Sequence, residues 1–305
     1  MTSSAKYFIQ QDNTEGDILA CCRKLTHHHD SPESAVEVLK HYVSASPNNQ
    51  RLWSHLSDYL IATGEIDEAK SAAQTAIDCS NGHPHVKDLI TAQVTASLAI
   101  VDDSRKLLFV SIPKCGSSTI KNFFTFCMFN ESYGETVHFR HPEIYRLVHW
   151  DEFTTKYKSY FKFSVYRDPI SRVFSYYKRN VYVDHSLVRD ACGANKSNNL
   201  ATKPGVLQAL QNFHDYRRVF TDFRHHTDPI TGYLGEDVDI YDRIFDISEC
   251  DEIKKILSER YEKEIKISDS MVSKVSVDTS KAKNDARLLN FLSRFYSKDY
   301  IFASK

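Results

Sequence analysis

The sequence predicts an α/β fold with a P-loop-like, mainly parallel sheet flanked by helices, preceded by an all-α, helical repeat-like segment. Two apolar runs indicate the sheet: a short one over Leu107–Val110 and an alternating, aromatic-rich one over Tyr160–Tyr166. Each leads through a polar loop into a helical pattern, which is typical of α/β units. An alanine-rich helical pattern without strand signals, over Ser31–Gly82, indicates the all-α part.

The alanine-rich segment resembles a tetratricopeptide repeat, whose period is about 34 residues. The residues near the expected repeat positions are Trp53, Leu56, Tyr59, Gly64, Ala69 and Ala76. One repeat and a partial one are too few for an independent solenoid, because each repeat needs neighbours to bury its face. We therefore expect the segment to dock on the rest of the chain or to self-associate, with an arm that recruits a protein or a substrate as the alternative.

The chain divides into a helical segment, 1–103, and an α/β domain, 104–305, joined without a linker rich in glycine, serine or proline. A helix over His85–Ala99 is expected to lead into the α/β domain. The later elements that the pattern predicts are a polar loop over Asn180–Gly205, a helix over Gly205–Phe223, a strand over Tyr241–Ile247, and helices over Cys250–Arg260 and Leu288–Ile301.

The composition is that of an ordinary globular protein: 305 residues, of which 41% are hydrophobic and 26% charged. A formal net charge of −1 gives no bulk electrostatic reason to expect nucleic-acid binding. No apolar run reaches the roughly 20 residues of a membrane span, and Met1–Gln10 lacks the pattern of a secretory signal. Seven cysteines without paired, zinc-type spacing predict a reducing, cytoplasmic environment.

The loop after Leu107–Val110 has the composition of an anion site. It carries Lys114 and a hydroxyl-rich turn, and a helix over Ile120–Met128 follows it. Backbone N–H groups at a helix N-terminus attract an anion, and the lysine adds a full positive charge. The Gly-x-x-x-x-Gly-Lys-Ser/Thr spacing of a nucleotide triphosphatase is missing, so we do not expect ATP phosphates with magnesium here.

The second strand-to-helix unit adds a guanidinium and a hydroxyl. Arg167 follows the strand over Tyr160–Tyr166, Asp168 can cap the next helix and Pro169 can open it. Because Ser175 lies on that helix, Arg167 and Ser175 can hold a phosphate together.

The runs IPKCGSST (112–119) and RDPISRVFSYY (167–177) resemble the two motifs of sulfotransferases that use 3′-phosphoadenosine 5′-phosphosulfate (PAPS). The resemblance covers Leu107–Phe302 and is nearest to the carbohydrate branch, with the heparan sulfate 2-O-sulfotransferases and their small bacterial relatives. It implies that Lys114 contacts the oxygen between phosphate and sulfate, and that Arg167 and Ser175 hold the 3′-phosphate. It also implies a loop for the 5′-phosphate, made of Lys114, Cys115 (a small filler), Gly116, Ser117, Ser118 and Thr119.

Transfer to an acceptor hydroxyl needs a base. The resemblance implies a histidine ahead of the second strand, in a His-x-x-x-Phe-like pattern that His149 and Phe153 fit. Imidazole, with an unperturbed pKa of about 6.5, suits that role near neutrality. The alternatives left open are His138, His141 and Glu152, and His149 can equally be a polar residue near a helix start.

The sequence therefore predicts a PAPS-dependent sulfotransferase that moves a sulfuryl group to a hydroxyl by in-line displacement and releases 3′-phosphoadenosine 5′-phosphate (PAP). The expected acceptor is a carbohydrate or another hydroxyl compound, and the repeat segment offers a surface for a protein partner or a second copy. Lysine and backbone amides supply the positive field, so no metal is expected. The alternatives are a non-catalytic, repeat-based interaction protein with a degenerate nucleotide-binding domain, and a phosphotransferase.

Overall fold

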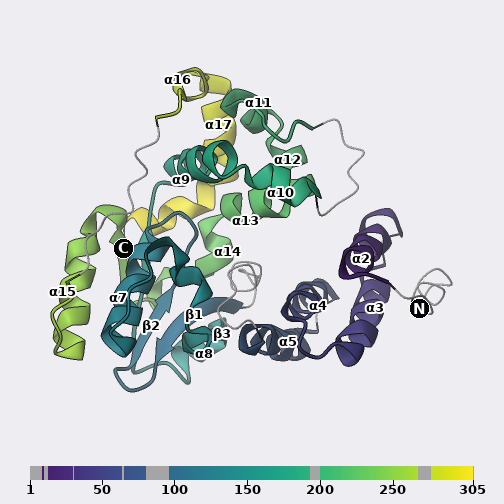
Figure 1. The fold of residues 1–305 in the computed structure, drawn as a ribbon. Helices are drawn as coiled ribbons and strands as arrows, with labels where there is room; N and C mark the ends of the chain where they lie inside the picture. Colours follow the sequence, from purple (N-terminus) through teal and green to yellow (C-terminus); the bar gives the residue numbers. More distant parts are fainter. Residues whose placement is uncertain are drawn as a thin grey trace.

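The computed structural model describes residues 9, 13–29, 31–63, 65–79, 96–192, 200–266 and 276–304. Figure 1 shows three parts: a sheet with flanking helices, a group of helices above it, and an arm of helices to one side. We call residues 169–227 and 280–295 the helical cap, and residues 15–78 the repeat arm. Residues 85–95, where a helix was expected, lie outside the described residues, as does Gly64 of the repeat pattern.

The described part of the repeat arm is entirely helical, with α2 (Glu15–His29), α3 (Pro32–Ala45), α4 (Gln50–Thr63) and α5 (Ile66–Asp78). Pro32 occupies the first turn of α3, where the N–H that proline lacks is not needed. Leu39, Leu56 and Ala69 are buried in the arm's own core. The Ser57 hydroxyl donates to the carbonyl of Ala69 across 2.8 Å, so α4 and α5 approach closely at a small residue.

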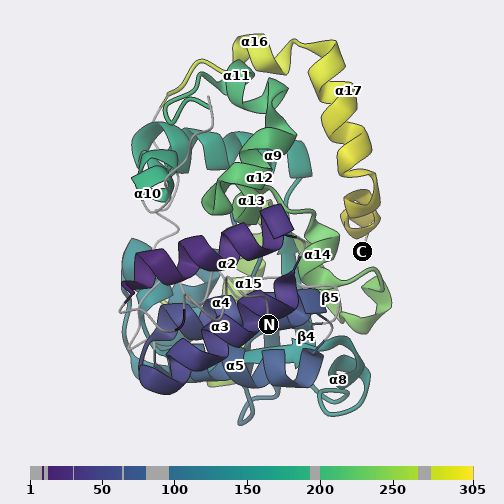
Figure 2. The ribbon, with the colours of Figure 1, turned by 90° about the vertical axis from the view of Figure 1, so that its right-hand side faces the viewer.

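The repeat arm is docked on the sheet rather than separate from it. Ala73, Ala76 and Ile77 of α5 lie in the same hydrophobic cluster as the strands, and Figure 2 shows the arm's helices stacked in front of the sheet. At the rim of this contact, Lys70 Nζ lies 2.5 Å from Glu152 Oε2. Docking within the chain is one of the two arrangements that the short repeat led us to expect.

The sheet has the strand order β3-β1-β2-β4-β5. The strands are β1 (Ala96–Asp102), β2 (Leu107–Val110), β3 (Tyr145–His149), β4 (Phe161–Tyr166) and β5 (Arg243–Asp246). β2 pairs with β4, and β4 with β5, in parallel, whereas β1 is antiparallel to both β2 and β3. The described sheet is therefore mixed: β3, β2, β4 and β5 run in one direction, in keeping with the expected mainly parallel sheet, and β1, between β3 and β2, runs against them.

β1 and β3 are the strands that the sequence did not predict. Residues 96–99 were expected to end a helix because alanine favours helices, yet they pair with β3, and Ala99 pairs with β2 as well. Packing between two neighbouring strands overrides the helix propensity here. As a result the sheet begins at Ala96, ahead of the boundary placed between residues 103 and 104.

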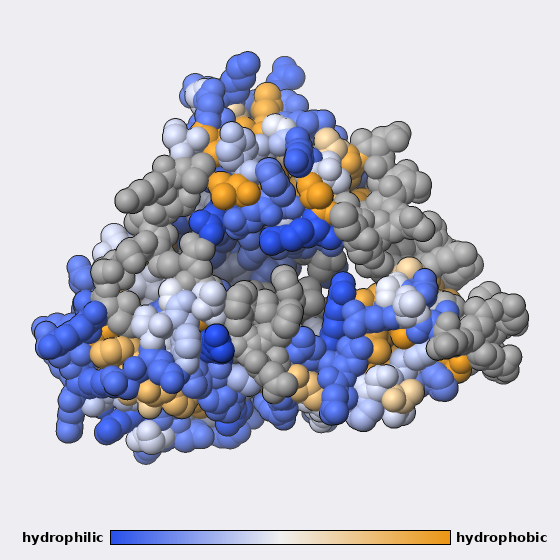
Figure 3. Space-filling model, viewed as in Figure 1, coloured by the Kyte–Doolittle hydropathy of each residue, from blue (hydrophilic) through white to orange (hydrophobic). Residues whose placement is uncertain are grey.

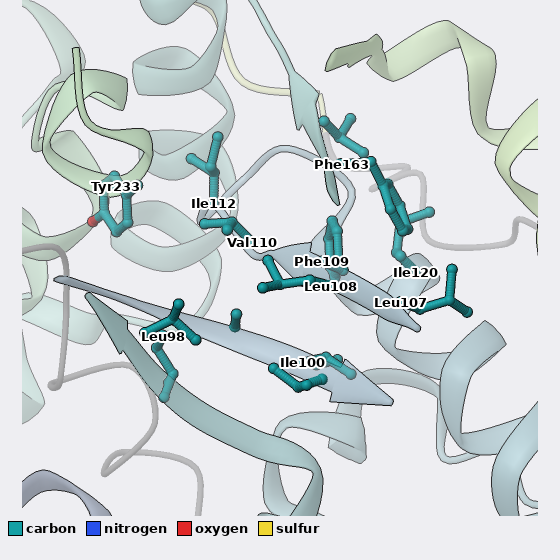
Figure 4. Packing of buried hydrophobic residues seen from close by; sticks show 14 of the residues in the cluster. Leu98, Ile100, Leu107, Leu108, Phe109, Val110, Ile112, Ile120, Phe163 and Tyr233 are labelled. Atoms are coloured by element: carbon teal, nitrogen blue, oxygen red, sulfur yellow. The ribbon is translucent and has the colours of Figure 1, made fainter. Parts of the chain in front are cut away.

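An aromatic core fills the space between the sheet and α7 (Ser117–Phe129). The Phe163 ring lies 5.1 Å from that of Phe109 and 6.2 Å from that of Phe124, between centroids. Figure 4 shows Phe163 and Phe109 beside one another, with Ile120 of α7 close to them. α15 (Cys250–Tyr261), which was predicted as a helix over Cys250–Arg260, packs against α7.

The helical cap has a separate hydrophobic core. Its helices are α9 (Pro169–Tyr176), the π-helix η3 (Tyr177–Val183), α10 (Ser186–Cys192), α11 (Val206–Gln211), α12 (Phe213–Val219), α13 (Thr221–Thr227), α16 (Ser280–Lys283) and α17 (Ala286–Phe295). The short elements elsewhere are η1 (Gly134–Phe139), η2 (Pro142–Ile144), α8 (Trp150–Thr154), α14 (Ile230–Leu234), η4 (Val238–Ile240), η5 (Ile247–Glu249) and η6 (Ser297–Ser304).

Three predictions for the cap and C-terminus need correction. The loop expected over Asn180–Gly205 is helical up to Cys192, because buried Val181 and Leu187 anchor it to the cap core, and residues 193–199 lie outside the description. The helix expected over Gly205–Phe223 is broken at Asn212 and Phe220. The terminal helix ends at Phe295 and continues as the 3₁₀-helix η6. In the described part of the chain, no helix is both long and apolar enough to cross a bilayer.

We predict that Phe163→Ala lowers the free energy of unfolding by about 3–5 kcal/mol, because it empties the centre of the aromatic core. Urea unfolding followed by fluorescence measures the change. The control Lys266→Ala removes a side chain that is 74% exposed and should stay within about 0.5 kcal/mol of the wild type. A loss of less than about 1 kcal/mol for Phe163→Ala would show that the core collapses around the cavity.

Candidate active site

The parallel pairing of β2 with β4 brings the two predicted anion loops together. Val110 is opposite Ser164, and the Ser164 hydroxyl donates to the Val110 carbonyl across 2.8 Å. Because parallel strands end at the same edge of a sheet, the loop after Val110 and Arg167 after β4 emerge side by side. Arg167 Nη1 donates to the carbonyl of Lys114 across 3.2 Å, which ties the second loop to the first.

The loop after β2 leads directly into the N-terminus of α7. Gly116 is the residue before the helix and has a φ of +72°, a left-handed conformation that favours glycine. Ser117 and Thr119 are buried in the first turn, and Ser118 is partly exposed between them. The loop therefore leads to the first N–H groups of a helix, the kind of place where the sequence led us to expect an anion site.

Lys114 is held at both its backbone and its side chain. Its φ of +65° lies in the left-handed region, which is uncommon for a residue with a side chain. Lys114 Nζ donates to Asn180 Oδ1 across 3.0 Å. Burial, followed by the charge of Arg179, lowers the pKa of Lys114 to about 8, and Arg167 adds to the effect. The carboxylates of Asp184 and Asp222 act in the opposite direction, burial is the largest cause of the lowered pKa, and a bound anion would favour the charged form.

The second motif has the local structure that its sequence predicted. The Asp168 carboxylate caps α9 by accepting from the Ser171 N–H at 2.7 Å, and Pro169 opens the helix. Arg167 and Ser175 are both partly exposed, so both can reach a ligand. Burial raises the pKa of the Cys115 thiol to about 11, so this residue of the first loop is a filler without thiolate character.

Arg172, in the centre of the second motif, is fully buried beneath the site. Its guanidinium donates to the carbonyl of Asp228, and it lies 6.0 Å from the ring centroids of both Tyr233 and Tyr296. These contacts join α9 to α14 and to the end of α17, so Arg172 holds together three elements around the site.

His138 is part of the first loop's surroundings. Its Nε2 lies 2.6 Å from Ser118 Oγ and its Nδ1 lies 2.9 Å from Lys121 Nζ. An ammonium can only donate, so Nδ1 accepts from Lys121 and the proton of a neutral ring sits on Nε2, facing Ser118. Both ring nitrogens are engaged, which leaves neither for the proton of an acceptor hydroxyl.

His149 lies at the same edge of the sheet as the first loop. It ends β3 opposite Ala96, and β1 runs antiparallel to β2, so the Ala96 end of β1 is the end where β2 finishes. Its Nε2 is buried and has no hydrogen-bond partner among the described residues. Its Nδ1 is 3.9 Å from Asp151 Oδ1, and the ring and Glu152 also form a reciprocal capping box at the start of α8.

The two other candidate bases are both in contact with charged side chains. His141 is bound between Glu131 at 3.0 Å and Glu143 at 2.8 Å. Glu152 accepts from the His149 backbone N–H at 2.9 Å and from Lys70. Although partial burial opposes the shift, these two contacts lower the pKa of Glu152, which makes it a weaker base.

Sequence reasoning missed Lys121 and Asn180. Lys121 follows Ser118 by three residues on a helix, so the i, i+3 spacing could have placed the two together. No helical spacing could have found Asn180, because it lies on the π-helix η3, whose wider turn changes the direction of its side chain. Figure 3 shows the molecule hollowed between the cap and the sheet, with strongly hydrophilic residues along the cap side of the hollow.

Comparison with protein families identifies both parts of the chain. The model of the sulfotransferase family matches residues 97–302, and the chain therefore belongs to this family. A tetratricopeptide-repeat model matches residues 29–92, which confirms the resemblance of the helical segment. Neither the curated proteins nor the solved structures contain a match to the chain. Among the described residues, no group of three or more histidine, cysteine, aspartate or glutamate side chains is arranged to hold a metal ion.

We predict that Lys114 loses its proton as the pH rises through about 8 and is fully charged well below that value. Competitive labelling with an amine-directed reagent over a pH series, followed by peptide mass spectrometry, gives the titration of this lysine alone. A small primary amine of ordinary pKa serves as the internal reference. If Lys114 titrates together with that reference, the burial and the arginine charges do not act on it as described.

Proposed function

We propose that the protein is a PAPS-dependent sulfotransferase that transfers a sulfuryl group to a hydroxyl of a carbohydrate. The observation that carries this proposal is the tie between Arg167 and the carbonyl of Lys114. This contact places the helix N-terminus and its lysine beside the arginine of the second motif, which supports a donor with two phosphate groups, one held by each motif. PAPS carries two separate phosphate groups, and a nucleoside triphosphate has its phosphates in one chain.

In the proposed reaction the acceptor oxygen attacks sulfur, and the bond from sulfur to the oxygen of the 5′-phosphate breaks. Negative charge develops on that oxygen, which leaves with PAP. Lys114 carries the ammonium that would stabilise this charge, and the N–H groups at the start of α7 would hold the 5′-phosphate. Arg167 and Ser175 would fix the 3′-phosphate and so align the donor for in-line transfer. Lysine, arginine and backbone amides supply the positive charge that this scheme needs.

His149 is the proposed base, because its Nε2 is the ring nitrogen that has no described partner at this edge of the sheet. For Nε2 to accept a proton, the other proton of the ring must sit on Nδ1. In this structure Nδ1 accepts from the backbone N–H of Glu152 and lies 3.9 Å from Asp151 Oδ1. If the ring turns away from Glu152 and toward Asp151, the Asp151 carboxylate can stabilise a proton on Nδ1. Such tightening on acceptor binding is common for catalytic hydrogen bonds.

Three finer assignments have separate grounds. The branch of the heparan sulfate 2-O-sulfotransferases in its bacterial form rests on the resemblance of the two motifs. A cytoplasmic location rests on the cysteines without paired spacing, and a protein partner or second copy bound through the repeat arm rests on the repeat pattern. The family match supports sulfuryl transfer, and the repeat match supports protein interaction. The docking of α5 on the sheet leaves the helices α2 to α4 as the part of the arm where a partner would bind.

We predict that PAP raises the midpoint of thermal unfolding and that ATP with magnesium does not. PAP at about 100 times its dissociation constant stabilises by roughly 2.7 kcal/mol, which is a shift of roughly 5–10 °C for a chain of this size. Differential scanning fluorimetry with each ligand and with neither measures it. A shift with ATP and magnesium alone would favour a phosphotransferase, and no shift with either would favour a non-catalytic, repeat-based interaction protein.

We predict that His149→Ala lowers kcat by about 10²–10⁴, the range for loss of a general base, with the PAP affinity unchanged. The measurement is sulfate transfer from labelled PAPS to a panel of sugars. His41→Ala is the matched control, because His41 is exposed on the repeat arm. Full activity of His149→Ala together with inactivity of His138→Ala would move the role of base to His138.

A further inference from the structure

The π-helix η3 brings one amide side chain between Lys114 and the core of the cap. Asn180 Oδ1 accepts from Lys114 Nζ at 3.0 Å, and Asn180 Nδ2 lies 3.0 Å from His226 Nε2. The two contacts use opposite ends of one amide group. π-helical turns are rare and are frequent at functional sites, and this one begins directly after the helix of the second motif.

The hydrogen-bond directions in this chain follow from charge. A lysine ammonium can only donate, so the amide oxygen must face Lys114 and the amide nitrogen must face His226. The amide nitrogen in turn only donates, so His226 Nε2 accepts. The orientation of Asn180 is therefore fixed from both sides: turning the amide over would place two donors against each other at Lys114 and two acceptors against each other at His226.

His226 is itself held by buried groups of the cap. Its ring packs 4.8 Å from the ring of Tyr176, between centroids. Asp222 lies one helical turn before it, and its Oδ2 accepts from the Tyr176 hydroxyl at 2.7 Å. Asp222 Oδ1 is 3.5 Å from His226 Nε2 but does not bind it, because the accepting Nε2 has no proton to donate. Tyr176 is fully buried next to Ser175, so the anchor of this chain belongs to the helix of the second anion motif.

We propose that Asn180 is a positioning residue that fixes the ammonium of Lys114 for sulfuryl transfer, and that His226 fixes the orientation of the Asn180 amide. The proposal rests on the proposed function for its catalytic meaning. Lysine has a long, flexible side chain, and Arg167 restrains only its backbone carbonyl. With one N–H of the ammonium bound to Asn180, the remaining two can face the donor from a fixed position.

Two substitutions of Asn180 should change the pKa of Lys114 in opposite directions, and competitive labelling over a pH series measures that pKa. Asn180→Asp keeps the size and the acceptor and adds a negative charge, so the affinity of Lys114 for its proton should rise about tenfold or more. Asn180→Leu removes an acceptor that favours the charged form, so the proton affinity should fall. The control Tyr182→Ser alters a side chain that is 52% exposed on the same π-helix and should change neither value.

The kinetic arm separates positioning from binding. Asn180→Leu should lower kcat for sulfate transfer by about tenfold or more, with the Kd for PAP within about threefold of the wild type. Thermal unfolding of each variant identifies any that is misfolded, and Asn180→Asp is nearly isosteric. Unchanged titration of Lys114 in both variants overturns the proposal. Failure of the wild type to bind PAP overturns the proposed function instead, and the titration still decides whether Asn180 fixes Lys114.

Discussion

The parallel pairing of β2 and β4 is the contact on which the site depends. The two predicted anion loops follow strands 107–110 and 161–166, about fifty residues apart in the sequence. Either loop alone would be a weak site for an anion. In-register pairing of Val110 with Ser164 ends both strands at one edge and turns two local motifs into one surface. The aromatic core around Phe163 fixes this pairing from the face of the sheet, so core packing and ligand geometry are set by the same strands.

The parts that sequence reasoning predicted are those in which local chemistry determines structure. Asp168 and Pro169 indicate where a helix begins, because one is a capping residue and the other favours the first helical turn. A lysine in a polar loop between a strand and a helix indicates a possible anion site. β1 was missed because its first half is rich in small residues, and only its two neighbouring strands make it extended. Asn180 was missed because the spacing of residues in a sequence does not indicate a π-helical turn. The contact between His138 and Ser118 was missed because it depends on how the chain folds back after α7.

The docked repeat arm is connected to the proposed base, His149, through α5 and Glu152. Ile77 and its alanine neighbours share the core of the sheet, so α5 cannot move away without exposing apolar surface. Lys70 of the same helix holds the Glu152 carboxylate, which in turn accepts from the backbone N–H of His149. A partner bound to the arm would therefore contact a rigid extension of the sheet, and an acceptor carried by that partner would be presented at a fixed distance from His149.

The electrostatics of the donor side explain why so many groups converge on one lysine. Burial, Arg179 and Arg167 disfavour a charge on Lys114 and outweigh Asp184 and Asp222, which favour it, yet an ammonium can stabilise negative charge only while it is charged. The Asn180 oxygen offsets part of that penalty in the protein without ligand, at a contact of 3.0 Å. A bound anion would offset the rest, because each of its negative charges relieves the repulsion among lysine and arginines at once.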